Sequence, residues 1–242
     1  MLDGYVLATQ RLLQNPAAPI PLYAPSDLSA YINTARGVLA GESESIRVMG
    51  SLATVVGQRP YLFSAINLIA APAGVLGVFN VRYAWYLVGN GQASLRPRPW
   101  PWYAQYKLNN PVPPSGPPAV WSIFGQGTTG SIYLDPLPDT VYTLPLDCVC
   151  VPVPLVDDST PEAIPYPWTD AVPFFAAYLA LLSSQTGARR AEADRMLADY
   201  EEWKNRARRI SNPSILPGLY EQSPNPVRIN QLGVSTGGGG GG

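Results

Sequence analysis

The hydrophobic pattern of this chain changes its period twice, and that change limits the possible folds more than any other feature. Apolar residues recur at helical spacing before residue 45 and again after residue 166. Between these positions, short runs of β-branched and aromatic residues are interrupted by Gly, Pro and Asn, which is typical of strands and hairpins. The sequence therefore predicts an α+β fold, in which N- and C-terminal helices form a helical bundle with an inserted antiparallel β domain and an extended C-terminal tail.

We expect four segments along the 242 residues. Residues 1–45 should form the N-terminal helices of the bundle, and residues 46–165 the inserted β-rich domain. Residues 166–211 should form a C-terminal helical hairpin that completes the bundle, and residues 212–242 an extended arm. A hydrophobic content of 46% is sufficient for a chain of this length to bury a real core.

In the N-terminal segment, a short helix is expected before Pro16, with Asp3 as a possible cap. A second helix should be capped by Ser26 or Asp27 and end near Gly41, because short polar side chains accept hydrogen bonds from the first free N–H groups of a helix.

Several strands are predicted in the β-rich segment. They cover residues 46–56, 59–63, 75–88, 119–124, 131–134 and 141–153, and a further strand follows a hairpin turn at Gly89-Asn90-Gly91. The last strand is apolar enough to be central. Prolines alternate with Arg and Trp over residues 96–102, so this stretch should be an edge strand or a polyproline segment.

The C-terminal hairpin begins with the most hydrophobic helix of the chain, over residues 168–184. Thr169 or Asp170 should cap it, and its apolar residues cover most of its circumference, so it should be buried on nearly all sides. An amphipathic partner helix is expected over residues 188–210. Its apolar face should hold Ala193, Met196, Leu197, Tyr200, Ala207 and Ile210.

The helical pattern stops at residue 211, and a tail rich in Pro and Gly follows. Isolated apolar residues in this tail are typical of anchors for a groove or sheet edge of another subunit. They are Ile215, Leu216, Leu219, Tyr220, Val227, Ile229 and Leu232.

Composition disfavours catalysis and cofactor binding. The chain has no histidine, the commonest general base and metal ligand. Its two cysteines, Cys148 and Cys150, should share one face of a strand as buried, reduced core residues, and they are too few for a zinc site. We therefore expect a protein that is not an enzyme and that holds no metal or cofactor.

Charge and hydropathy indicate the kind of partner. A net charge of −1 gives no basic stripe for tight binding of DNA phosphates. Only 14% of the residues are charged, so the surface should expose apolar area suited to assembly with other proteins. The N-terminus lacks the features of a signal peptide, and no apolar run is long enough to span a membrane. We expect a protein made in a cytosol, without a membrane partner.

Two motifs resemble functional sites but have simpler explanations. Residues 125–130 match the GxGxxG pattern of dinucleotide-binding turns, yet a strand follows them where the motif requires a helix, so a hairpin turn is expected. Asp157, Asp158 and Glu162 lie in a stretch typical of turns and helix starts, rather than a catalytic carboxylate pair.

A third motif combines cations with aromatic residues at Arg96, Arg98, Trp100 and Trp102. A rigid edge packed on its own domain would explain it. Such residues also occur at protein interfaces and at sites for single-stranded nucleic acid or sugar, and these alternatives stay open.

Several stretches resemble a known family. Residues 26–36 read Ser-Asp-Leu-Ser-Ala-Tyr-Ile-Asn-Thr-Ala-Arg, and this stretch resembles one near the start of head-to-tail adaptor (neck or connector) proteins of podovirus-like, short-tailed bacteriophages. Residues 164–180, the following charged helix and residues 213–217 resemble the C-terminal half of the same proteins. Residues 96–99 and 109–111 are also similar, so the likeness spans nearly the whole chain except the glycine tail.

The resemblance implies a structural virion protein of the neck and tail, assembled in the host cytoplasm. It implies a homo-oligomeric ring of twelve copies that binds the portal protein above and tail nozzle or tube proteins below. Genomic DNA would pass through the ring without specific binding. The apolar residues of the tail named above are the candidate portal-binding residues, and Arg96, Arg98, Trp100 and Trp102 are candidates for a tail-protein or subunit interface.

Two alternatives remain from the sequence. One is a tail-tube or nozzle structural protein, in which the β domain would be the main assembly element. The other belongs to a different class, a carbohydrate- or nucleic-acid-binding module that uses the Arg and Trp residues of the 96–102 stretch.

Overall fold

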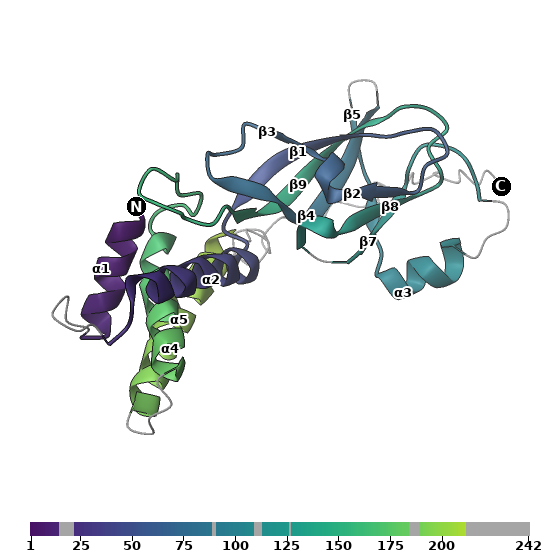
Figure 1. Cartoon of the computed structure of the whole chain (residues 1–242). Helices are drawn as coiled ribbons and strands as arrows, with labels where there is room; N and C mark the ends of the chain where they lie inside the picture. The colour runs from purple at the N-terminus through teal and green to yellow at the C-terminus, as the bar shows by residue number, and fades with distance from the viewer. Residues whose placement is uncertain (15–21, 89–90, 109–112, 126, 184–188, 212–242) are drawn as a thin grey trace, which may run out of the picture.

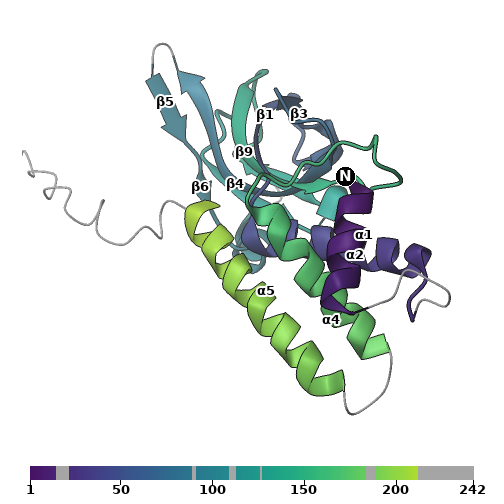
Figure 2. The same cartoon turned by 90° about the vertical axis from the view of Figure 1, so that its left-hand side faces the viewer.

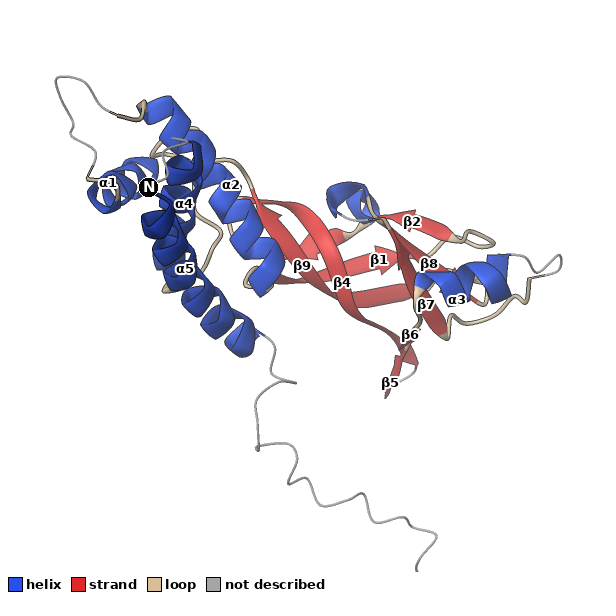
Figure 3. Ribbon diagram, turned by 90° about the horizontal axis from the view of Figure 1, so that it is seen from below, coloured by secondary structure: helices blue, strands red, loops and turns tan. Residues whose placement is uncertain are grey.

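The structure is a computed structural model that describes residues 1–14, 22–88, 91–108, 113–125, 127–183 and 189–211 (Figure 1). These residues form a mixed α+β fold, which confirms the predicted fold class. Four helices gather at one end of the molecule, and two β-sheets lie beyond them (Figures 1 and 3). The portal-binding candidates between residues 215 and 232 lie outside the described residues.

The helices at this end are α1 (Leu2–Leu12), α2 (Pro25–Ser43), α4 (Val172–Ser183) and α5 (Arg190–Ser211). They pack on one another through small and aliphatic side chains, and α4 and α5 run side by side (Figure 2).

The caps predicted for the N-terminal helices are wrong. Helix α1 begins after Met1 without a side-chain cap, so Asp3 lies in its first turn. Helix α2 begins at Pro25, because the fixed φ of proline suits the first helical position and its missing N–H would be unpaired there anyway.

The C-terminal hairpin follows its predicted pattern with two differences. A 3₁₀ turn, η4 (Trp168–Ala171), precedes α4, so the expected capping residues lie inside this turn. No residue from Ala171 to Leu181 is exposed, as expected for a helix covered on nearly all sides. On α5, Ala193, Met196, Tyr200 and Ala207 are buried, but Ile210 is 65% exposed, so its predicted place on the buried face is wrong.

The β region contains two sheets. The five-stranded sheet has the order β3-β1-β9-β4-β5, and the four-stranded sheet the order β2-β8-β7-β6. The strands are β1 (Arg47–Ala53), β2 (Pro60–Leu62), β3 (Asn67–Ile69), β4 (Val75–Val88), β5 (Gly91–Ser94), β6 (Arg96–Pro97), β7 (Val120–Phe124), β8 (Ser131–Asp135) and β9 (Thr143–Pro152). Among the described strands, β6 and β7 pair in parallel and the other pairs are antiparallel, so the prediction of an antiparallel domain needs this one correction.

Most of the predicted strands are present. Strand β9 is central and largely buried, as its apolar sequence indicated. Strand β6 lies at a sheet edge, as the alternating prolines required. The short strand β3 was not predicted. Helix α3 (Trp100–Tyr103) and the π-helical turn η2 (Ala104–Leu108) were also missed, because prolines at Pro99 and Pro101 fit a helix start as well as an edge strand.

One contiguous core joins the helices to both sheets. It includes Ile32 and Leu39 of α2, Leu146 of β9 and Ile132 of β8, each of them fully buried. Because these side chains are in one cluster, the β region is packed directly against the helical end rather than held by linkers alone.

Candidate functional site

The loop between β9 and η4 is held to the helices by a buried ion pair. Arg36 of α2 donates from Nε to Glu162 Oε2 at 2.9 Å and from Nη2 to Glu162 Oε1 at 2.7 Å. The same guanidinium donates from Nη1 to the carbonyl oxygen of Val153 at 2.7 Å. Such a bidentate pair fixes the relative position of two elements because both of its bonds are directional.

Two further side chains extend this cluster. The Tyr5 hydroxyl of α1 donates to Glu162 Oε2 at 2.8 Å, and burial together with the nearby Glu162 carboxylate raises the pKa of Tyr5 well above its usual range. The Asn33 side chain donates to the carbonyl oxygen of Leu155 at 3.0 Å and accepts from the Leu155 N–H at 2.7 Å. We call Tyr5, Asn33, Arg36 and Glu162 the loop clamp; its hydrogen bonds are made within the chain.

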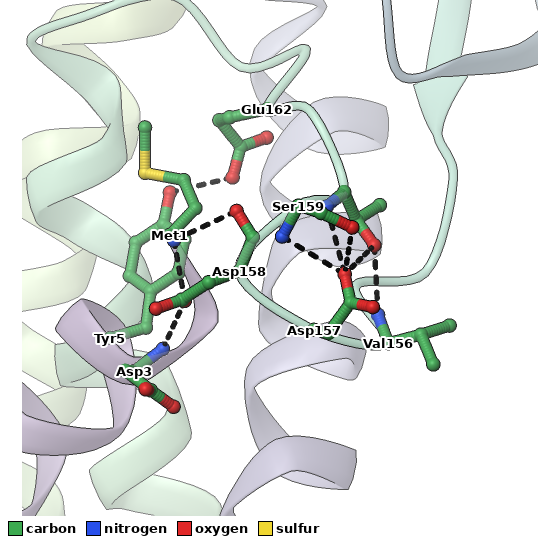
Figure 4. Close-up of polar contacts among 9 residues, drawn as sticks. Met1, Asp3, Tyr5, Val156, Asp157, Asp158, Ser159 and Glu162 are labelled. Carbon is green, nitrogen blue, oxygen red and sulfur yellow. Dashed lines mark hydrogen bonds and ion pairs between the residues drawn. The ribbon is translucent and has the colours of Figure 1, made fainter.

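Of the two aspartates in this loop, Asp157 forms a turn and Asp158 contacts the N-terminus of α1 (Figure 4). Asp157 Oδ1 accepts hydrogen bonds from the backbone N–H groups and hydroxyls of Ser159 and Thr160, which lower its pKa. Asp158 Oδ1 accepts from the ammonium of Met1 at 2.5 Å and from the Asp3 N–H at 2.8 Å, and both donors lower its pKa. The turn role expected for this stretch is confirmed for Asp157. Asp158 instead contacts the start of α1, and Glu162 forms the buried ion pair with Arg36, which the sequence did not indicate.

Helix α3 lies at the end of the β region away from α1 and α4 (Figure 3). Aromatic side chains pack around this helix. Trp100 is half-buried and packs on neighbouring rings, with its ring centroid 4.5 Å from that of Phe124 and 4.8 Å from that of Tyr133. The buried Tyr103 donates its hydroxyl to the Leu134 carbonyl oxygen at 2.7 Å. For Trp100, the expected role in packing an edge on its own domain is therefore observed.

Trp102 has a different environment from Trp100. The Arg98 guanidinium lies 5.0 Å from the Trp102 ring centroid, and the Lys107 ammonium lies 5.7 Å from it. Tyr106, which is 57% exposed, has its ring 5.6 Å from that of Trp102. We call Arg98, Trp102, Tyr106 and Lys107 the cation–aromatic patch. Arg96 is exposed on β6, and the structure records no contact between its side chain and this patch.

Large apolar side chains are also exposed over the β region. They include Val55, Val56, Leu62, Ile69, Leu76, Leu108 and Phe124. Exposed apolar groups of this kind are typical of a subunit that buries surface against other proteins.

The remaining sequence motifs serve the fold. The glycine-rich stretch 125–130 connects the antiparallel strands β7 and β8 through the turn Gly127–Thr129, so the hairpin expected there is confirmed. Cys148 and Cys150 are free, buried thiols, as predicted. Over the described residues, no group of three or more His, Cys, Asp or Glu is placed to hold a metal ion. None of the helices in that part of the chain is long and apolar enough to cross a membrane.

The loop clamp belongs to the fold, while the cation–aromatic patch and the exposed apolar residues are typical of structural proteins that assemble with other proteins. Comparison with known families agrees with this class. The model of the SU10 adaptor protein family matches residues 6–219, most of the chain, and the chain therefore belongs to the SU10 adaptor protein family. No curated protein matches the chain.

Membership confirms the resemblance to phage head-to-tail adaptors and identifies a structural component of a bacteriophage virion. It implies association with portal and tail components in an oligomeric assembly. The loop clamp also gives a physical reason for the residues that carried the resemblance, since Asn33 and Arg36 lie in the stretch 26–36 and both bind the loop after β9. Sequence reasoning missed this role, because nothing near these residues in the chain indicates their partners.

Proposed function

We propose that this protein is the portal-bound head-to-tail adaptor of its phage. Twelve copies form a ring below the capsid portal, and the ring encloses part of the channel through which DNA leaves the head. Tail nozzle or tube proteins bind beneath it. The observation that carries the proposal is the family match over residues 6–219.

The arrangement of the chain supports a two-sided connector. We propose that residues 1–45 and 166–211 form the ring-building bundle, and that the β domain 46–165 faces the tail. Helix α3, which carries Trp102 of the cation–aromatic patch, lies at the end of the β domain away from α1 and α4 (Figure 3). Phe124 on β7, the strand that α3 contacts, is exposed. Aromatic residues and arginines supply much of the binding energy in protein interfaces.

We assign portal binding to the C-terminal arm, residues 212–242. Its apolar residues, from Ile215 to Leu232, would anchor in a groove or pair with a sheet edge of the portal.

DNA would pass without specific contacts, because a chain of net charge −1 lacks the cations for tight phosphate binding. We propose no catalytic activity. A sugar or nucleic-acid platform is less well supported, since the Trp100 ring packs on Phe124 and Tyr133 of its own chain.

The test is electron microscopy with mass analysis of the purified protein, alone and mixed with the portal of its phage. A stoichiometric ring on the portal supports the adaptor function, whereas a protein that stays monomeric with portal present contradicts it. Deletion of residues 212–242 should abolish portal binding. Unchanged binding would refute the role of the arm.

The tail-facing surface is tested separately by Trp102→Ala. This variant should weaken binding of the nozzle protein at least tenfold and leave the ring on the portal intact. Arg206→Ala, which removes an exposed arginine of α5, is the matched control and should bind the nozzle protein normally. Equal binding by the two variants would exclude the patch from the tail interface.

A further inference from the structure

A groove of about 490 Å³ lies on the outer face of the five-stranded sheet. It is lined by Arg47, Met49, Tyr83, Trp85, Ser94 and Asp147. Successive residues of a strand point to opposite faces, so Arg47 and Met49 are exposed while Val48 and Gly50 face the core. Met49 is 42% exposed and Tyr83 is 49% exposed, so the groove offers apolar surface to a ligand.

Helix α5 ends at the rim of this groove. Arg47, which lines the groove and pairs with Asp147, also donates from Nη1 to the carbonyl oxygen of Ser211 at 2.7 Å. Arg82 Nη1 lies 3.5 Å from the same oxygen. The last turn of α5 is thus fixed beside the groove, and the sequence continues with Asn212 and Pro213, of which proline disfavours helix.

The sequence that follows Ser211 matches the groove in character. No charged residue occurs from Asn212 to Tyr220, and Glu221 is the first. Four of the seven arm residues singled out as anchors lie in this stretch: Ile215, Leu216, Leu219 and Tyr220.

The chain after Ser211 is long enough to reach across the groove. The groove crosses four neighbouring strands, β1, β9, β4 and β5, which at about 4.8 Å per spacing is about 14 Å. An extended chain advances about 3.3 Å per residue. Ile215, the fourth residue after Ser211, can therefore reach about 13 Å from the rim, and Tyr220 can reach past the far side.

We infer that in the unassembled subunit this groove binds residues 213–220 of its own C-terminal arm. Ile215 and Leu216 lie against the apolar surface of Met49 and Tyr83. We choose the arm of the same chain as the occupant. Its short tether gives it an effective concentration near millimolar at the groove, whereas the arm of a second copy is far more dilute in dilute solution.

This inference does not depend on the proposed function. Docking of residues 213–220 in the free subunit leaves Val227, Ile229 and Leu232 available for a first contact with the portal. The docked residues Ile215, Leu216, Leu219 and Tyr220 would have to leave the groove before they could bind elsewhere. A failed portal experiment would therefore not affect it.

The test is disulfide cross-linking in the full chain carrying Met49→Cys and Leu216→Cys. Leu62→Cys with Leu216→Cys is the control, because Leu62 is 56% exposed on the other sheet. Equal amounts of ¹⁴N- and ¹⁵N-labelled protein are mixed before mild oxidation, and mass spectrometry of the cross-linked peptides separates bonds within one chain from bonds between chains.

We expect the Met49→Cys pair to cross-link within one chain at least tenfold more than the control pair. Equal yields for the two pairs, or no cross-link, would overturn the inference. Cross-links that join ¹⁴N and ¹⁵N peptides would overturn the choice of occupant and assign the groove to the arm of a neighbouring copy.

Hydrogen exchange tests the same contact without added cysteines. Amides of residues 214–220 should exchange at least tenfold more slowly in the full chain than in the Leu216→Ser variant. Leu232→Ser, which lies outside the proposed segment, should leave their exchange unchanged. Free exchange of these amides in the unaltered protein would contradict docking.

Discussion

Arg36 and Glu162 are 126 residues apart in the chain, yet their side chains form a bidentate ion pair in which they are 1% and 4% exposed. The pair joins α2 to the loop that leads from the β domain into the last two helices. Because both charges are removed from water, each depends on the other for its hydrogen bonds. The pair therefore fixes the position of α2 relative to the loop after β9.

Breaking this pair should destabilise the protein strongly. Arg36→Met leaves the Glu162 carboxylate buried without its cation, which typically costs about 3–5 kcal/mol. The double variant Arg36→Met/Glu162→Leu removes both charges and should recover more than half of that loss. Urea unfolding followed by circular dichroism measures both changes.

Arg206→Ala is the control for this measurement. Arg206 pairs with Glu202 on the exposed side of α5, and such surface pairs contribute at most about 1 kcal/mol. A loss for Arg36→Met no larger than for Arg206→Ala would show that the loop clamp does not stabilise the fold.

Local features of the fold could be predicted because they depend on neighbours in the chain. Strand β4 occupies the predicted residues 75–88, since β-branched and aromatic residues there are bounded by turn residues. The helix caps were wrong because several polar residues near a helix start can serve equally well. In α2, the proline at position 25 decided the start instead.

The candidate site could be predicted only in part, because its contacts are not local. Asn33 and Arg36 were recognised through a resemblance, but their partners Leu155 and Glu162 follow more than a hundred residues later. Likewise, the Arg and Trp residues of the 96–102 stretch look alike in sequence. Only the packing of α3 on β7 and β8 distinguishes Trp100, which contacts Phe124 and Tyr133, from the cation–aromatic patch.

Gly50 should not tolerate a side chain. A Cβ added there would lie 2.6 Å from Ile66 Cγ2 and 2.8 Å from Cys148 Sγ, inside the packed core of the β domain. Gly50→Ala should therefore lower the free energy of unfolding by about 1–3 kcal/mol, the usual cost of overpacking. The urea midpoint reports the change.

Gly37 provides the matched comparison, because nothing lies within 4 Å of a Cβ added at this position in α2. Gly37→Ala should stabilise the protein by about 0.5–1 kcal/mol, since alanine favours the helix and glycine does not. Similar effects of the two alanine substitutions would contradict the close packing around Gly50.

The contacts of Asp158 should make stability depend on acid pH. Hydrogen bonds from Met1 and Asp3 lower the pKa of Asp158 in the folded protein below its unfolded value of about 3.9. This contribution is complete above the unfolded pKa and is lost as the pH falls through the folded pKa. Relative to wild type, Asp158→Asn should lower the melting temperature at pH 6, and the difference should shrink in acid. Asp194→Asn, which makes the same change of charge on α5, should show no such convergence.

The two thiols of β9 should make stability depend on alkaline pH. Their contribution is lost as the pH rises, whereas that of Asp158 is lost as the pH falls. Burial first, then the neighbouring Cys150 and Asp147, raise the pKa of Cys148 to about 12, and burial raises the pKa of Cys150 to about 11. In the unfolded chain both thiols ionise near pH 8.5, so unfolding releases protons above that pH and stability falls until the folded pKa values are passed.

At pH 8 a thiol reagent should therefore leave the native protein unlabelled and modify two cysteines in urea. The double variant Cys148→Ala/Cys150→Ala should lose stability less steeply than wild type between about pH 8.5 and pH 11. Labelling of the native protein at the rate seen in urea, or equal slopes for the two proteins, would contradict the burial of these thiols in the core.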